Sequence, residues 1–197
     1  MSTRVGIVYL GIFASALACA DPQTLAKDAF DAPATIEVSS TAIRAGGPID
    51  VKYSAYGQGI SPPLRWSSLP DGTQSVVLMM EDPDARSPTP FVHWSIVNIT
   101  PSLHDLPENV REASTPLLGK DVRRGTNSNS ERGYFGPRPP AGDPPHHYHF
   151  QIFALDTQLN LPEGFNRDAL LQAMRGHVLA EGELIGLFQA PKNKRGI

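Results

Sequence analysis

Ser75-Val76-Val77-Leu78-Met79-Met80-Glu81-Asp82-Pro83-Asp84 joins an apolar run to an acidic turn. An uninterrupted apolar run over residues 75–80, bounded by turn residues, is typical of a strand buried on both faces. Because Pro83 fixes its own φ and restricts the residue before it, Asp82 and Asp84 should leave the strand end in a defined relation. An ordinary turn, in which Asp side chains bond nearby amides, is the alternative interpretation.

Two further segments have strong strand character, residues 91–99 and 148–155. Weaker patterns predict strands at 35–39, 49–53, 64–66 and 182–189, and one helix at 166–178 that Asn166 can cap. Residues 100–145 show almost no periodicity, which is typical of functional loops or disordered segments. The 19 prolines and 17 glycines also favour a loop-rich β fold.

Length and charge limit the classes of function. The 197 residues suit one domain with a short leader, and 40% hydrophobic residues are enough for a core. The formal net charge of -3 provides no basic footprint, so we expect no nucleic-acid partner.

Residues 1–20 have the pattern of a signal peptide. Arg4 precedes an apolar segment that is too short to span a membrane, and Ala18-Cys19-Ala20 fits a small-x-small cleavage site. We therefore expect export to the periplasm or outside the cell, with residues 21–34 as an N-terminal tether, a domain at 35–190 and a basic tail at 191–197. The alternative is a lipoprotein anchored at Cys19, although Ala16 is not the usual aliphatic residue of such a signal.

Residues 146–149 read His-His-Tyr-His. On a strand, His147 and His149 face one side, whereas His146 and Tyr148 face the other. Three histidines in four positions suggest zinc or copper, but neither an HExxH motif nor a set of cysteine ligands accompanies them, so we predict no metal. His93 lies in another strand, and a lone strand histidine is more often a satisfied core or surface group than a ligand-binding residue.

Together these segments resemble the phosphatidylethanolamine-binding protein family, above all its bacterial branch of Raf kinase inhibitor-like proteins. The resemblance covers about residues 35–190. It is carried by Asp82-Pro83-Asp84, His93-Trp94, Gly133-x-x-Gly136-Pro137-x-Pro139-Pro140 and His146-x-Tyr148. Further matches are Ser61-Pro62-Pro63-Leu64-x-Trp66, Asn127-Ser128, Ala154-Leu155-Asp156 and Gly182-Glu183-Leu184-Ile185-Gly186. Each piece is weak alone, but their order and spacing are specific.

The resemblance implies an all-β fold, a two-sheet antiparallel β-sandwich with a few peripheral helices. It also implies a small pocket for an anion such as phosphate or a phosphoryl head group, and no cofactor. Carried over by position, the pocket lining is Asp82, Asp84, His93, Pro139, Pro140, His146 and Tyr148. Some members inhibit or regulate other proteins and bacterial members often form dimers, so a protein target and a homodimer both stay open.

Two carboxylates beside an anion require an explanation, because like charges 4 Å apart repel by about 4 kcal/mol at an effective dielectric near 20. We predict that Asp82 or Asp84 binds one nitrogen of His93 or His146, and that the charged ring donates its other N–H to a phosphoryl oxygen. Alternatively, a carboxylate meets a cationic head group such as ethanolamine.

The chain departs from the family pattern around this pocket. His147 stands where an arginine is common, Arg138 stands where bacterial members commonly have cysteine, and Asp143-Pro144-Pro145 forms a longer insert before His146. These changes bear on ligand affinity rather than on the fold.

The rival function is a hydrolase that uses the same His and Asp residues, with or without a metal. No Gly-x-Ser-x-Gly nucleophile motif is present, so we expect a non-enzymatic binding protein without catalytic residues.

Overall fold

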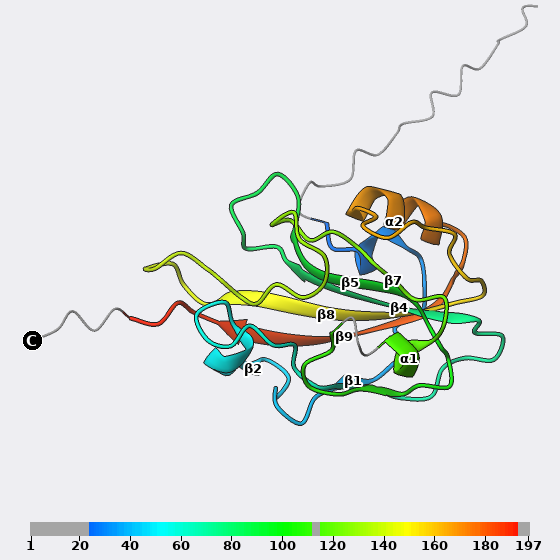
Figure 1. The fold of residues 1–197 in the computed structure, drawn as a ribbon, viewed down its shortest axis with the longest axis horizontal. Coiled ribbons are helices and arrows are strands. Elements are labelled where there is room, and N and C mark those ends of the chain that lie inside the picture. Colours follow the sequence, from blue (N-terminus) through cyan, green and yellow to red (C-terminus); the bar gives the residue numbers. More distant parts are fainter. Residues whose placement is uncertain (1–23, 112–114, 193–197) are drawn as a thin grey trace, which may run out of the picture.

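The computed structural model describes residues 24–111 and 115–192, which form two β-sheets with peripheral helices (Figure 1). The strands are β1 (Val38–Ser39), β2 (Gly47–Pro48), β3 (Leu64–Trp66), β4 (Ser75–Asp82), β5 (Phe91–Ile99), β6 (Asp105–Leu106), β7 (Arg123–Arg124), β8 (His146–Leu155) and β9 (Val178–Phe188). The larger sheet has the order β2-β9-β8-β4-β5-β7, and the smaller one has the order β1-β3-β6. Every named pair is antiparallel except β2 with β9, which confirms the predicted fold class.

The core strand β4 is buried along its whole length, as its apolar run predicts. Leu78 and Met80 belong to the hydrophobic cluster that also contains β3 and β6 side chains from the smaller sheet. Val77 and Met79 point the opposite way and pack with residues of helix α2 (Arg167–Met174). Burial of each such side chain contributes roughly 1.5–3 kcal/mol, so β4 fixes the centre of the larger sheet.

The described helices are short, as expected for this fold: α1 (Thr115–Leu118), α2, and the 3-10 turns η1 (Lys27–Ala29) and η2 (Val51–Tyr53). Asn166 caps α2 as predicted, because its side chain accepts a hydrogen bond of 2.9 Å from the Ala169 amide. The helix ends at Met174 rather than at residue 178, and Gly176 then adopts a φ of 77°, which turns the chain into β9.

The strand predicted at residues 49–53 is wrong, because this segment contains the 3-10 turn η2. Ile49 and Tyr53 are buried, whereas Val51 between them is 47% exposed. The Asp50 side chain accepts a hydrogen bond of 2.8 Å from the Lys52 amide and starts the turn. A local side-chain bond therefore overrides the alternating pattern.

The chain from residue 24 onward packs on the larger sheet, although residues 21–34 were expected to form a tether. The amide of Ala26 donates to Glu81 Oε2 at 2.7 Å, and the amide of Lys27 donates to Gln151 Oε1 at 2.8 Å. Arg167 Nη2 also donates to the carbonyl of Thr24 at 2.7 Å. The expected signal peptide, residues 1–20, and the end of the basic tail, residues 193–197, lie outside the described residues.

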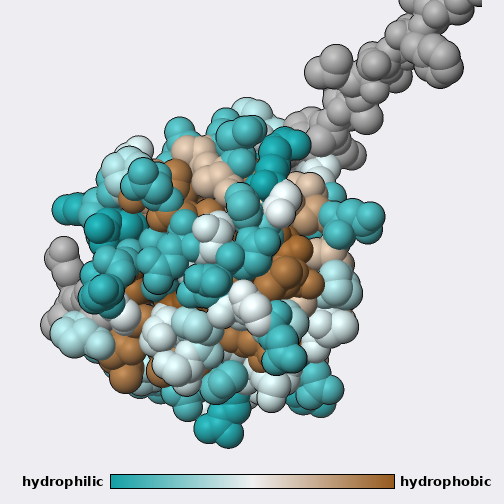
Figure 2. All heavy atoms as spheres, turned by 90° about the vertical axis from the view of Figure 1, so that its right-hand side faces the viewer, coloured by the Kyte–Doolittle hydropathy of each residue, from teal (hydrophilic) through white to brown (hydrophobic). Residues whose placement is uncertain are grey.

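The surface in Figure 2 carries hydrophobic residues as small patches between hydrophilic ones. The large hydrophobic residues that are exposed within the described chain are Val51, Tyr56 and Leu117. Of the helices at residues 24–111 and 115–192, none is long and apolar enough to cross a membrane.

Candidate functional site

The carboxylate of Asp82 joins the end of β4 to the start of β8. These strands pair in antiparallel register, so the two ends meet at the same edge of the sheet. Asp82 Oδ1 accepts a hydrogen bond of 2.8 Å from the Asp84 amide, and Oδ2 lies 2.8 Å from Nδ1 of His146. Burial raises the pKa of Asp82, although the contact with His146 acts against this. The prediction that an aspartate orients a pocket histidine is confirmed for Asp82 and His146.

Asp84 points away from this contact and binds His147 instead. Its Oδ2 accepts a hydrogen bond of 2.7 Å from the His147 amide and lies 2.7 Å from Nδ1 of the same residue. Burial would raise the pKa of Asp84, but the hydrogen bonds from His147 outweigh it and leave the pKa below its usual value. Asp84 is therefore absent from the pocket lining, which corrects its expected position. Its charge is already matched by hydrogen-bond donors outside the pocket.

A cavity of about 230 Å³ lies beside Asp82. Of the predicted residues, it is lined by Asp82, His93, Pro139, Pro140 and His146. The remaining lining residues are Ala85, Arg86, Phe91, Asn129, Phe135 and Arg138. Segments from β4, β5, the loop before β8 and β8 itself thus converge on one site, as the family resemblance implied.

His93 is a neutral group in this cavity. Burial, with a smaller electrostatic contribution from His146, lowers the pKa of His93 to about 4 against the hydrogen bond to Phe135. Nδ1 lies 2.8 Å from the carbonyl oxygen of Phe135, which can only accept, so Nδ1 carries the proton. The other ring nitrogen then presents a lone pair. His93 consequently does not fit the expected role of a charged donor to an anion.

Tyr148 supports the cavity from behind and does not line it, which corrects its expected position. The side chain is fully buried, and its hydroxyl has no hydrogen-bond partner among the described residues. Its ring contacts that of His93 edge-on, with centroids 5.1 Å apart, and stacks on His146 at 6.4 Å. Burial, with the negative charge of Asp82, raises its pKa. Tyr148 therefore packs against both histidine rings.

Two arginines complete the cavity and were not among the predicted site residues. Arg86 follows the Asp82 turn, and its Nη2 lies 2.7 Å from Oδ1 of Asp143. Arg138 is exposed, and its guanidinium forms no hydrogen bond or ion pair with another described residue. The proximity of Arg86 to Asp143 links positions 57 apart in sequence, so no periodic pattern could have revealed it.

The histidines of β8 do not gather around one point. His146 faces Asp82, His147 faces Asp84, and Nδ1 of His149 lies 2.7 Å from Glu183 Oε2. Within residues 24–111 and 115–192, no group of three or more His, Cys, Asp or Glu side chains could hold a metal ion. Successive side chains on a strand point to opposite faces, so histidines that are adjacent in sequence have different partners.

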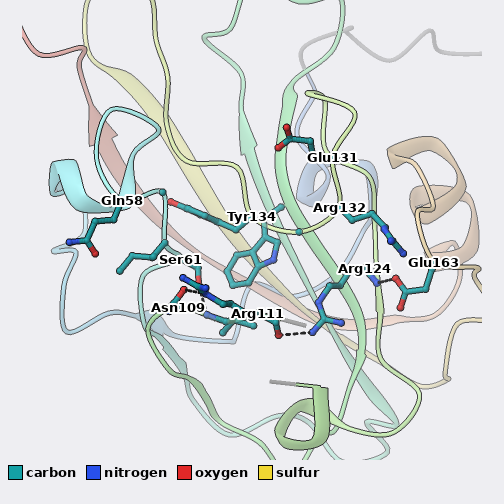
Figure 3. Close-up of a pocket in the computed structure, with 14 residues that line it drawn as sticks. Gln58, Ser61, Asn109, Arg111, Arg124, Glu131, Arg132, Tyr134 and Glu163 are labelled. Carbon is teal, nitrogen blue, oxygen red and sulfur yellow. Dashed lines mark hydrogen bonds between the residues drawn. The ribbon is translucent and has the colours of Figure 1, made fainter. Parts of the chain in front are cut away.

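A second, larger cavity has a volume of about 540 Å³ (Figure 3). Its lining includes Trp94, which follows His93 on β5. Two of the arginines that line this cavity, Arg111 and Arg124, contact other residues of the lining. Arg124 Nη2 donates to the carbonyl of Arg111 at 3.0 Å, and the Arg124 amide donates to Glu163 at 3.1 Å. Arg111 Nε donates to Asn109 Oδ1 at 2.7 Å. The two Arg124 contacts connect separate segments of the chain, whereas the Arg111 contact is local. None of the predicted site residues lines this cavity.

Comparison with known proteins gives one consistent family. A family model described as phosphatidylethanolamine-binding protein matches residues 39–189. A UPF0098 protein of Methanothermobacter thermautotrophicus is 43% identical over 73% of this chain and 91% of its own length. A phosphatidylethanolamine-binding protein homolog from Chlamydia trachomatis, CT736, is 37% identical with a TM-score of 0.71, covering 79% of this chain and 98% of that one. Escherichia coli YbcL, described as a new member of the mammalian PEBP family, is 27% identical with a TM-score of 0.74, covering 80% and 100%.

Proposed function

This chain belongs to the phosphatidylethanolamine-binding protein family, and we propose on that basis that the cavity beside Asp82 binds a small phosphorylated or otherwise anionic ligand. The observation that carries the proposal is the convergence of Arg86, Arg138 and His146 on one cavity. The carboxylate of Asp82 is already occupied by the loop amide and by His146, so it repels an anion less than a free carboxylate would.

The cations at this cavity suit a phosphoryl group. A guanidinium can present two parallel N–H donors to an oxyanion, and such charge-assisted bonds are stronger than neutral ones. The prolines at 139 and 140 add a stiff wall, and Phe91 and Phe135 add apolar surface. A volume of about 230 Å³ falls below the roughly 300–1,000 Å³ of typical drug-sized pockets. We therefore propose a head group or a small anion as the ligand, rather than a whole lipid.

We propose that binding proceeds without catalysis. The cavity lining includes no serine, threonine or cysteine among the described residues, so it offers no hydroxyl or thiol nucleophile. The hydrolase alternative would instead need water activated by His93, whose low pKa makes it a weak base. A phosphatase and esterase screen is expected to find no turnover. Turnover that His93→Ala abolishes would establish the hydrolase.

Export and a protein target are further parts of the proposal that rest on the sequence. A chain cleaved after Ala20 would begin at Asp21, whereas a lipoprotein would begin at a modified Cys19. Intact mass measurement of the protein from its native host distinguishes the two products, and an unprocessed N-terminus would contradict both. A regulated partner protein would be sought by crosslinking in that same compartment.

Arg138 gives the sharpest test of the anion pocket. Because its guanidinium has no other described partner, we expect Arg138→Ala to weaken inorganic phosphate binding by at least tenfold, the loss of about 1.5–3 kcal/mol for a charged hydrogen bond. Isothermal titration calorimetry measures this directly. Arg65→Ala is the matched control, because Arg65 is 70% exposed and lies in β3 of the other sheet. Equal affinities of the two variants would refute the proposed role of Arg138.

A further inference from the structure

Asp143 lies between two of the groups that would bind the ligand. Its Oδ1 is 2.7 Å from Arg86 Nη2, and its Oδ2 is 3.7 Å from Nε2 of His146. Arg86 and His146 both line the cavity, and Nδ1 of His146 is already bound to Asp82. The only ring nitrogen of His146 that remains for a ligand therefore faces a carboxylate of this same chain.

The loop that carries Asp143 is held by its backbone. The Asp143 amide donates to the carbonyl of Pro140 at 3.2 Å, and Gly142 between them has a φ of 98°, as a tight turn requires. Gln189 Nε2 donates to the Asp143 carbonyl at 2.7 Å. Pro144 follows and restricts the backbone of Asp143 to extended conformations. The fold thus holds the backbone of Asp143 in place beside Arg86 and His146, two residues that line the cavity.

The arginine end of this contact is exposed to solvent. The Asp143 side chain is only 15% exposed, but its partner Arg86 is 78% exposed. Exposed ion pairs contribute little to stability, because water and salt screen them and the long side chain loses freedom. The distance of 3.7 Å to His146 exceeds hydrogen-bond length, so that second contact is purely electrostatic.

We propose that Asp143 is an internal competitor of the pocket, whose carboxylate occupies the side chains of Arg86 and His146 that an external anion needs. This inference rests on the proposed anion-binding function. An anion enters when its oxygens replace those of Asp143 at Arg86 and His146, and the carboxylate turns outward. The pocket consequently selects against weak monovalent carboxylates, which resemble Asp143, and favours anions that engage Arg138 as well.

The test is phosphate binding by Asp143→Asn, with Asp105→Asn as the matched control. Asp105 is also an aspartate paired with an arginine, Arg65, at 3.8 Å, and it lies on the other sheet. Because a like charge is removed from the ligand position, we expect Asp143→Asn to bind inorganic phosphate about tenfold more tightly than the wild type, with no change in Asp105→Asn. Unchanged or weaker binding would overturn the inference and assign Asp143 to the positioning of Arg86.

A second measurement uses Asp143→Ala, in which the carboxylate and its bulk are both removed. Acetate should then compete with phosphate in the variant and much less in the wild type, because it can take the vacated place. Absence of competition would count against the internal competitor. If neither the wild type nor any Asp143 variant binds phosphate, the proposed function itself fails. If the wild type binds and Asp143→Asn binds no better, only the competitor fails.

Discussion

At the scale of single residues, burial decides what each histidine in the pocket can do. His93 is 3% exposed and its proton is committed to a carbonyl, so it remains neutral. His146 is equally buried, but it meets the carboxylate of Asp82. The two histidines therefore differ in role: His93 is a neutral residue of the cavity lining, whereas His146 binds the carboxylate of Asp82.

The low pKa of His93 predicts a dependence of stability on pH. The unfolded chain protonates this residue near pH 6.5 and the folded chain only near pH 4, so the unfolded state binds more protons between these values. The contribution of His93 is complete above pH 6.5 and is lost as the pH falls towards 4, by on the order of 3 kcal/mol. Urea unfolding at a series of pH values measures this.

The raised pKa of Asp82 has the opposite effect on the dependence of stability on pH. The contribution of His93 is therefore measured by comparing the wild type with His93→Gln. The variant should lose less stability than the wild type between pH 6.5 and pH 4. Parallel curves for the two proteins would contradict a neutral, buried His93.

At the scale of elements, the loop before β8 is fixed against η2. A Cβ on Gly136 would lie 2.6 Å from the carbonyl oxygen of Tyr53 and 2.7 Å from the amide nitrogen of Ala55. The Ala55 amide also donates to the Pro137 carbonyl at 3.0 Å. This close approach of two backbones places Arg138 and the two following prolines at the cavity.

We expect Gly136→Ala to lower the free energy of unfolding by about 2 kcal/mol, since backbone atoms must move to admit the methyl group. It should also weaken phosphate binding, because the loop shifts. Gly133→Ala is the control: nothing lies within 4 Å of its Cβ, and only its φ of 91° adds strain, of about 1 kcal/mol. Thermal unfolding and calorimetry compare the two. A smaller effect at Gly136 than at Gly133 would argue against this packing.

At the scale of the whole molecule, the sequence predicts the centre of the fold better than its edges. The apolar runs of β4, β5 and β8 identify core strands because burial on both faces leaves little freedom in residue type. The turn η2 does not follow from the alternating pattern, because it begins with the hydrogen bond that the Asp50 side chain accepts from the Lys52 amide. The candidate site shows the same difference. The contact between Asp82 and His146 could be predicted from their positions in the sequence. The contacts of Asp84 with His147 and of Asp143 with Arg86 could not, because they depend on the geometry of the loops.

Histidine NMR during a titration with inorganic phosphate at constant pH tests whether this family member binds an anion beside Asp82. We predict that the ring signals of His93 and His146 shift together and saturate with one dissociation constant. His104 and His177, which do not line the cavity, provide the internal control and should stay in place. Signals that do not move, or that move equally at all four histidines, would contradict it.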